Sequence, residues 1–190
     1  MKILLNAFLL FSFIGAFAQL PSLPIDSTTH LITYSEVVKV DGNKDELYSR
    51  AREWFAKTYN SAQSVIQMDT KDKIVGKALM QVYYKGGDFG YINYTVSIYL
   101  KDGKYKYEIT DFYHTGEERS GGVYIGNYYV PTPNIPDYGL CEEMMHEKKK
   151  HAQKVFNLLL TQMDENIKAL IITLKESMNK QAVKNSDENF

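Results

Sequence analysis

Residues 96–114, VSIYLKDGKYKYEITDFYH, decide the predicted fold. Apolar and polar residues alternate on both sides of Asp102-Gly103, and this dipeptide between two alternating runs is a strong signal for a β-hairpin with a two-residue type I′ turn. The expected cross-strand pairs are Leu100–Tyr105, Ile98–Tyr107 and Val96–Ile109 on an apolar side, and Tyr99–Lys106, Ser97–Glu108 and Thr95–Thr110 on a more polar side. Because a slip of one residue would mix the two sets, the stretch predicts a hairpin with one buried face.

The alternation fails at Asp111-Phe112, which predicts a β-bulge or the end of the strand. Outward from the hairpin, β-rich or alternating stretches predict strands at residues 30–40, 65–68, 74–84 and 91–100. We expect these strands to form one antiparallel sheet of about five strands.

Two amphipathic helices accompany these strands. Asn43 and Glu46 have the spacing of a capping box, and the apolar residues after them recur at steps of three and four, which predicts a helix with Trp54 in the core. A longer apolar stripe, from about residue 140 to residue 178, predicts a C-terminal helix. The predicted fold class is therefore α+β, in the order β-α-β-β-β-β-α, with a curved antiparallel sheet packed against one short and one long helix.

The N-terminus predicts export. Lys2 precedes an almost wholly apolar run, and Ala16-Phe17-Ala18 has the small-x-small pattern of a signal peptide cleaved after Ala18. The run is shorter than the roughly 20 apolar residues that span a membrane, and no later run is long enough. We expect a periplasmic or extracellular protein without a transmembrane segment in the mature chain.

The remaining chain is predicted to be one domain. Residues 19–29 are rich in Pro, Ser and Thr and predict a linker, residues 30–179 form the domain, and the polar residues 180–190 predict a disordered tail. The hydrophobic fraction of 44% suffices for a core, while the net charge of −1 argues against a nucleic-acid binder. The single cysteine, Cys141, excludes an internal disulfide, so packing must stabilise the fold.

Residues 114–139 form an insertion dense in Tyr, Gly and Pro, with no helical period and no sustained strand period. Long irregular segments in compact domains are often functional, and exposed tyrosines recur at binding surfaces. The candidate binding residues are Tyr124, Tyr128, Tyr129 and Tyr138. In the alternative interpretation this segment folds back, and its tyrosines seal the helix against the sheet.

Catalytic and metal-binding patterns are absent from the sequence. His146 and His151 lie five apart, which separates them by about 140° on a helix, so one zinc ion cannot easily take both. No nucleophile elbow, P-loop or cysteine–metal pattern occurs. We expect no catalytic residue, no metal and no cofactor.

Three stretches, VDGNKDELYSRAREWFAKTY, IVGKALMQVYY and VSIYLKDGKYKYEITDFYH, together with the signal peptide and the order of elements, resemble a family of secreted bacterial domains of unknown function with a TATA-binding-protein-like fold. The resemblance covers roughly residues 34–114 and reaches the final helix by topology only. It implies the fold but no activity, so no functional residue is carried over. The fold name does not imply DNA binding, which export and the net negative charge oppose.

We therefore expect an exported, non-enzymatic binding domain that contacts an unknown protein or polysaccharide at an envelope or extracellular site. The alternative is a carrier of a small apolar ligand, with a cavity between sheet and long helix lined by Met80, Tyr107 and Leu159. The third possibility is an enzyme, for which acid–base groups should converge at His114.

Overall fold

The computed structural model describes residues 21–115, 123–125, 128–130, 138–139 and 150–179. For residues 123–125, 128–130, 138–139 and 151 it describes the backbone alone. The predicted signal peptide, Cys141, His146 and the predicted tail lie outside these residues, so those predictions stay predictions.

The chain folds in the predicted order, with short additions. One helical turn, α2, precedes the second strand, and three short strands follow the fifth. The elements are β1 (Tyr34–Lys39), α1 (Lys44–Thr58), α2 (Ala62–Val65), β2 (Ile66–Thr70), β3 (Lys73–Tyr84), β4 (Gly87–Lys101), β5 (Lys104–Thr115), β6 (Val123–Ile125), β7 (Tyr128–Val130), β8 (Tyr138–Gly139) and α4 (Lys150–Met178).

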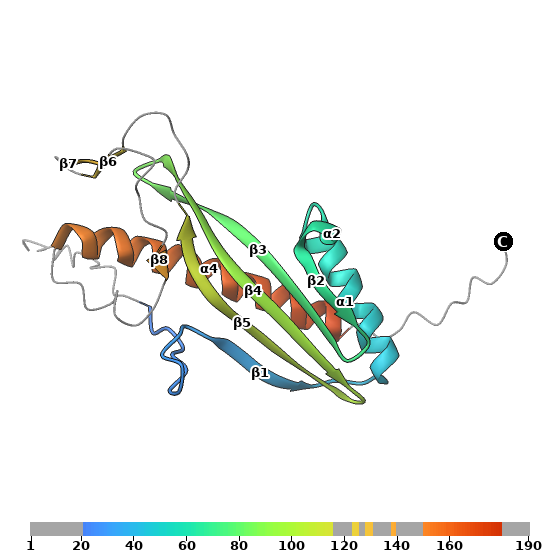
Figure 1. Ribbon diagram of the computed structural model, residues 1–190. Coiled ribbons are helices and arrows are strands. Elements are labelled where there is room, and N and C mark those ends of the chain that lie inside the picture. The colour runs from blue at the N-terminus through green and yellow to red at the C-terminus, as the bar shows by residue number, and fades with distance from the viewer. Residues whose placement is uncertain (1–20, 116–122, 126–127, 131–137, 140–149, 180–190) are drawn as a thin grey trace, which may run out of the picture.

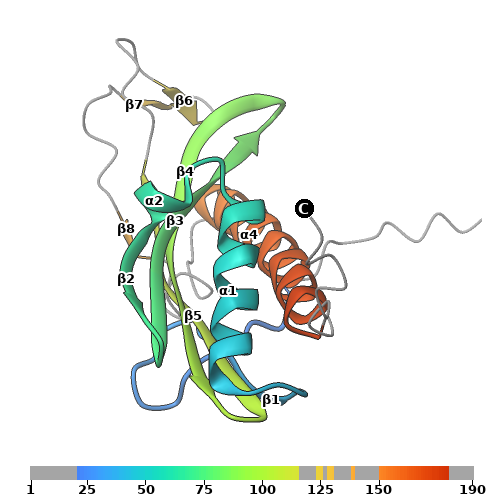
Figure 2. The same cartoon turned by 90° about the vertical axis from the view of Figure 1, so that its right-hand side faces the viewer.

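The main sheet is antiparallel and has the strand order β1-β5-β4-β3-β2, with β8 paired to β5. Its long central strands are strongly curved (Figure 1). Figure 2 shows α1 and α4 side by side on one face of this sheet, and no helix of the described residues covers the opposite face. The predicted α+β class and the curved sheet with one short and one long helix are thus confirmed.

The β4–β5 hairpin has the predicted register at every pair, from Leu100–Tyr105 beside the turn to Thr95–Thr110. The predicted turn type is wrong. Gly103 has a φ of 70°, but Asp102 does not have a positive φ, and a positive φ at the second central residue alone is the pattern of a type II turn. Tertiary contacts hold the turn: the Lys44 amide donates to Asp102 Oδ1 at 2.7 Å, and the Gly103 amide donates to the Gly42 carbonyl at 2.9 Å.

The predicted bulge is present where the alternation fails. Asn93 pairs with Tyr113 and Thr95 with Thr110, so Asp111 and Phe112 together oppose Tyr94, and Asp111 adopts a φ of 57°. The extra residue changes which side chains face the helices. Phe112 and His114 become buried as a result.

Helix α1 begins with the predicted capping box. The Glu46 amide donates to Asn43 Oδ1, and the Asn43 amide donates to Glu46 Oε2, both at 3.0 Å. Trp54 is a core residue with 2% of its surface exposed, and its Nε1 donates to Thr173 Oγ1 of α4 at 3.1 Å. The prediction that Trp54 anchors the core is therefore confirmed.

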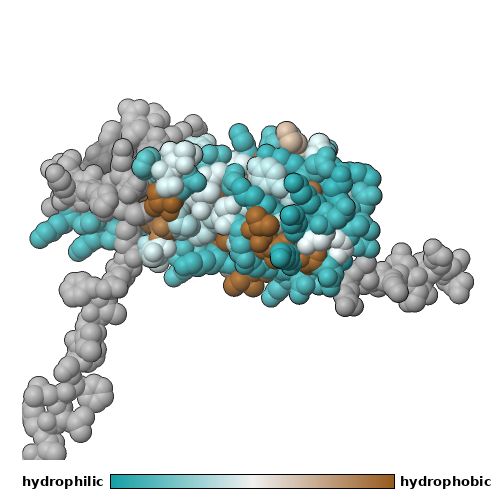
Figure 3. All heavy atoms as spheres, turned by 90° about the horizontal axis from the view of Figure 1, so that it is seen from below, coloured by the Kyte–Doolittle hydropathy of each residue, from teal (hydrophilic) through white to brown (hydrophobic). Residues whose placement is uncertain are grey.

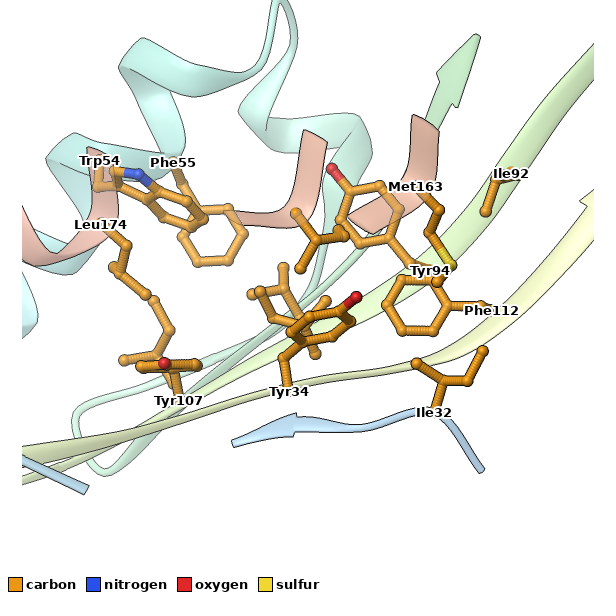
Figure 4. Close-up of a cluster of buried hydrophobic side chains, with 14 of the residues drawn as sticks. Ile32, Tyr34, Trp54, Phe55, Ile92, Tyr94, Tyr107, Phe112, Met163 and Leu174 are labelled. Atoms are coloured by element: carbon orange, nitrogen blue, oxygen red, sulfur yellow. The ribbon is translucent and has the colours of Figure 1, made fainter. Parts of the chain in front are cut away.

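The core lies between the sheet and the two helices (Figure 4). Aromatic rings run through it, with Phe112 against Tyr34 and Tyr94 in one part, and Trp54 against Phe55 in another. Most of the predicted stripe of α4 is buried; these buried members are Val155, Leu159, Met163, Ile167, Leu174 and Met178. In the described part of the chain, no helix is long and apolar enough to cross a membrane.

Arg50 is an exception to the helix pattern, which places it outside the apolar stripe of α1. The structure buries it, and its Nη1 donates to the carbonyl of Asp41 at 2.7 Å and to that of Met178 at 2.9 Å. Because the last carbonyls of a helix lack intrahelical partners, Arg50 satisfies the end of α4 and ties it to the β1–α1 connection.

The predicted linker is described from Pro21 onward, and there it packs on the domain. Ile25 pairs with Ile32 across a turn in which the Asp26 carboxylate accepts hydrogen bonds from the amides of Thr28 and Thr29. Leu23 and Ile25 pack against the core. This part of the segment is a folded turn because it contributes two apolar side chains to the interior.

Candidate functional site

Strand β3 is much longer than its neighbour β2. The two strands pair only from Thr70–Lys73 to Ile66–Gly76. Past Gly76, β3 continues beside β4, and among the described residues no strand lies on its other side. We call residues 77–81 of β3 the open edge.

Gly76 marks the place where the covering of β3 ends. A Cβ atom at this position would lie 2.6 Å from the ring of Phe55 and 3.0 Å from Val65 Cγ1. The glycine therefore lets α1 and α2 press onto the strand here. The end of α1 and the short helix α2 then form a corner beside the open edge (Figure 1).

A groove of about 720 Å³ lies between this corner and the strands. One wall comes from the α1–α2 corner, and the floor and other wall come from β3, β4 and β5. The lining residues are Thr58, Tyr59, Asn60, Ser61, Ser64, Val65, Lys77, Ala78, Leu79, Asn93, Tyr94, Thr95, Asp111 and Tyr113.

The lining is mostly neutral, and among the described residues that form it only Lys77 and Asp111 are charged. Leu79 is 57% exposed and Tyr113 is 41% exposed, so two large apolar groups meet solvent here. Asn93 lies between them, since it pairs with Leu79 of β3 and with Tyr113 of β5. This row of three outward positions gives the groove an apolar contact surface beside amide and hydroxyl groups.

Two tyrosines close the bottom of the groove. The hydroxyl groups of Tyr59 and Tyr94 lie 3.3 Å apart, which joins the end of α1 to β4. Burial raises the pKa of both phenols above the usual value, so both remain neutral at physiological pH. They can offer hydrogen bonds but cannot act as bases.

The four tyrosines predicted to bind fall on the short strands. Tyr124 pairs with Tyr129 in the β6–β7 hairpin, which also contains Tyr128, and Tyr138 pairs with His114 through β8. These are backbone positions, and the side chains of all four lie outside the described residues. The predicted binding role of this segment therefore stays a prediction.

His114 has a structural position. It is fully buried, its Nε2 lies 2.7 Å from the Phe89 carbonyl oxygen, and its ring packs 5.3 Å from that of Phe89. The contact ties the beginning of β4 to the end of β5. An acid–base role for His114 would require that a substrate reach its imidazole ring, which has no exposed surface in this structure.

Met80, Tyr107 and Leu159 do not line one small cavity. Tyr107 donates its hydroxyl to Glu36, which also pairs with Lys175 near the C-terminus of α4. Lys175 lies about 24 Å from Leu159 along the helix axis, at 1.5 Å per residue. In Figure 4, Tyr107 lies beside Leu174, whereas Met163, one helical turn from Leu159, and Ile92, the cross-strand partner of Met80, lie at the other side of the cluster.

No group of three His, Cys, Asp or Glu side chains that could hold a metal occurs within the described ranges.

The groove residues Leu79 and Tyr113 were not singled out from the sequence, although one signal was present. The outward positions of β3 read Lys77, Leu79, Gln81 and Tyr83, so a leucine and a tyrosine interrupt a polar phase.

A family model described as "Domain of unknown function (DUF4468) with TBP-like fold" matches residues 34–115. The chain is similar to the crystal structure of a TBP-like protein from Parabacteroides distasonis, with 13% identity and a TM-score of 0.51 over 79% of this chain and 96% of that chain. It is also similar to a DUF4468 family protein from Bacteroides ovatus, with 11% identity and a TM-score of 0.51 over 84% of this chain and 93% of that chain. No curated protein matches the chain. The resemblance inferred from the sequence is confirmed, and at these identities the two structures show the fold alone.

Proposed function

We propose that this chain, whose residues 34–115 match the domain of unknown function with TBP-like fold, is an exported, non-enzymatic binding domain for another protein at the envelope or outside the cell. The observation that carries the proposal is the groove beside the open edge of β3, with Leu79 and Tyr113 exposed in it.

The physical reason is the free energy that these side chains gain on being covered. Burying a leucine or an aromatic side chain contributes about 1.5–3 kcal/mol, and tyrosines are among the residues that dominate interface energies. The nearly uncharged lining supports recognition by shape and hydrogen bonds over attraction by charge. A protein surface with apolar side chains between polar groups matches this lining.

The groove also supports a role without catalysis. General acid–base catalysis needs a titratable group that changes protonation near neutral pH within reach of a substrate. The raised pKa values of Tyr59 and Tyr94 move these two groove residues away from that range. Export belongs to the proposal because Lys2, the apolar run and Ala16-Phe17-Ala18 form the pattern of a cleaved signal peptide.

Site-specific photo-crosslinking tests this function. A photoreactive amino acid is placed at Leu79 of the mature chain, and at Ile172 of α4 as a control, because both positions are 57% exposed. After irradiation with an envelope extract, position 79 should give a discrete adduct with one protein, identified by mass spectrometry, and position 172 should not.

Equal adducts from both positions, or no adduct from position 79, would contradict the proposed binding role of the groove. An adduct that disappears on treatment with glycosidases would instead assign the groove to a polysaccharide.

A further inference from the structure

We infer that the open edge of β3 is completed by an extended segment of the partner protein, which adds to the sheet as one more strand. This inference rests on the proposed function and names the mode of binding. It follows from the main chain of β3, because an unpaired strand edge presents alternating N–H and C=O groups that another extended chain satisfies best.

The open edge has the length of an ordinary strand, about five residues. It begins after Gly76, where the pairing of β3 with β2 ends. Within the described residues, the backbone hydrogen bonds of this part of β3 run to β4, which it pairs without interruption from Ile74–Ile98 to Gln81–Tyr91. A strand-shaped place therefore remains beside β3, next to the groove.

Beyond the open edge, at Tyr83, the side chain of Gln162 forms the backbone hydrogen bonds that a neighbouring strand would form. The Tyr83 amide donates to Gln162 Oε1 at 3.0 Å, and Gln162 Nε2 donates to the Tyr83 carbonyl at 2.9 Å. A carboxamide thus occupies the position that the peptide group of a neighbouring strand would take. It shows that this side of β3 accepts an amide in strand geometry, and it sets the point where an added strand must stop.

The open edge has few of the features that protect sheet edges from other chains. Edges are commonly protected by charged residues, proline or bulges, but residues 77–81 contain one lysine and no proline. The opposite edge strand, β1, carries the charged residues Glu36 and Lys39 in a shorter element. Seen from the side that carries β1, the apolar side chains form small separate patches within a hydrophilic surface (Figure 3).

The neighbouring side chains define the chemistry of the added segment. Its residues on the outer face would lie beside Leu79, and those on the inner face beside Ala78 and Met80, which are half-buried. Both faces favour apolar, β-branched or aromatic residues. Since Lys77 and Asp111 are the only charged residues in the described lining of the groove, we assign the occupant as an uncharged β-forming segment of about five residues.

Random peptides displayed on phage serve as the probe, with the mature chain as the bait. Hydrogen exchange is measured residue by residue in β3 with and without a selected synthetic peptide. The outward amides of residues 77–81 should exchange rapidly in the free protein and slowly in the complex. The Tyr83 amide should be slow in both, because Gln162 accepts its hydrogen bond.

Two chemical changes separate strand addition from other binding. Methylation of alternate backbone nitrogens in the peptide should weaken binding by about tenfold or more, since the peptide loses main-chain donors. Leu79→Asp should weaken it by about the same factor, whereas Ile172→Asp, at an equally exposed leucine-sized residue on α4, should leave it unchanged.

Slow exchange of the outward amides of residues 77–81 in the free protein would overturn the inference, because the chain would then cover its own edge. Failure to select any peptide that slows these amides would also overturn it, as would a peptide unaffected by backbone methylation. If the Leu79 adduct forms but the captured partner leaves exchange of the outward amides of residues 77–81 unchanged, the groove binds and strand addition is wrong. If the adduct is also missing, the proposed function itself fails.

Discussion

The two ends of the sheet have different surroundings. At the end that carries the β4–β5 turn, α1, the C-terminus of α4 and the β1–α1 connection meet around the strands, with Arg50 and Trp54 joining them. At the end that carries the β3–β4 turn, α4 is the only described helix beside the strands (Figure 1), and Gln162 makes the contact. We call them the closed end and the open end.

This difference indicates that the closed end contributes most of the stability, whereas the open end has surface groups that a partner can contact. Buried side chains at the closed end contact several elements at once, so truncating one of them destabilises both helices and the sheet. At the open end, long strands project past the helix α1, and their outward groups meet solvent. Binding regions belong to the less stable parts of proteins because they must accept new contacts.

The largest expected effect is at the centre of the closed end. Trp54→Ala should lower the free energy of unfolding by about 3–5 kcal/mol, because it empties a large aromatic site in the core. Leu79→Ala at the open end should change it by less than about 0.5 kcal/mol, as for other exposed positions. Urea denaturation of both variants measures the difference, and equal losses would contradict the division into two ends.

Arg50→Met tests the joint between α1 and α4. The substitution keeps an unbranched apolar stem but leaves the carbonyls of Asp41 and Met178 without their donor, which should cost about 2 kcal/mol. Arg52→Met is the control, because the Arg52 side chain is 56% exposed. Amide exchange should increase in the last turn of α4 for Arg50→Met only; the same pattern for Arg52→Met would refute a specific role of Arg50.

The two turns allow one substitution to be compared at both ends. Gly103 and Gly86 have φ values of 70° and 76°, and a Cβ at either would meet no atom within 4 Å. Valine therefore introduces backbone strain without a clash at both sites. Gly103→Val should cost about 1–2 kcal/mol, because hydrogen bonds to Gly42 and Lys44 hold its turn.

Gly86→Val should cost less than Gly103→Val, because the Lys85-Gly86 turn can change its conformation at the open end. The two denaturant midpoints, measured side by side, decide the order. A larger loss for Gly86→Val would mean that the β3–β4 turn is the more constrained of the two.

Gln162→Leu should lower stability by about 1 kcal/mol, the usual effect of losing hydrogen bonds of this kind. Its specific effect is local, since the Tyr83 amide should exchange faster while β4 and β5 remain protected. Glu165→Leu, at an exposed neighbouring position of α4, is the control. Unchanged exchange of Tyr83 would contradict the strand-like role of Gln162.

The smallest expected effect concerns pH. The ammonium group of Lys175 and the hydroxyl of Tyr107 lower the pKa of Glu36 below its ordinary value of 4.5. A lowered carboxyl pKa stabilises the fold above the ordinary pKa, and this contribution is lost as pH falls below 4.5 through the folded-state pKa.

The Glu36 contribution should stay below about 1 kcal/mol, because the side chain is 47% exposed and salt screens the pair. Glu36→Gln should flatten the stability profile slightly in that acidic range and leave stability near pH 7 reduced by a similar small amount. Identical profiles for wild type and variant would show that the pair contributes nothing.

Much of the fold was predictable because local patterns carry it. The alternation around Asp102-Gly103 predicts the hairpin register, since the side chains of a strand repeat every two residues and one face is buried. The capping box of Asn43 and Glu46 predicts the beginning of α1, and the failure of alternation at Asp111 predicts the bulge. Each signal depends on a few neighbouring residues, so no knowledge of the packing is needed.

The candidate site was much less predictable. The sequence directs attention to tyrosines in the insertion, whereas the groove combines residues from α1, α2, β3, β4 and β5. Leu79 and Tyr113 are 34 positions apart along the chain and become neighbours of Asn93 only through the sheet. A weak local signal existed, because Leu79 lies among the outward-facing positions of β3, where polar residues are expected. The wall of the groove, however, depends on where α1 ends.

By itself, the sequence determined the class of fold, the register of the central hairpin and the inward faces of the helices, because periodicity and capping act over a few residues. The tertiary structure alone decided the turn at Asp102-Gly103, the burial of Arg50 and the open edge of β3. These depend on contacts between distant segments: the β1–α1 connection against the turn, the end of α4 against Arg50, and Phe55 against Gly76, where β2 leaves β3. Arg50 and Phe55 are buried and must find partners that only the packed chain supplies. The Asp102-Gly103 turn is exposed, and hydrogen bonds to the distant Gly42 and Lys44 hold it.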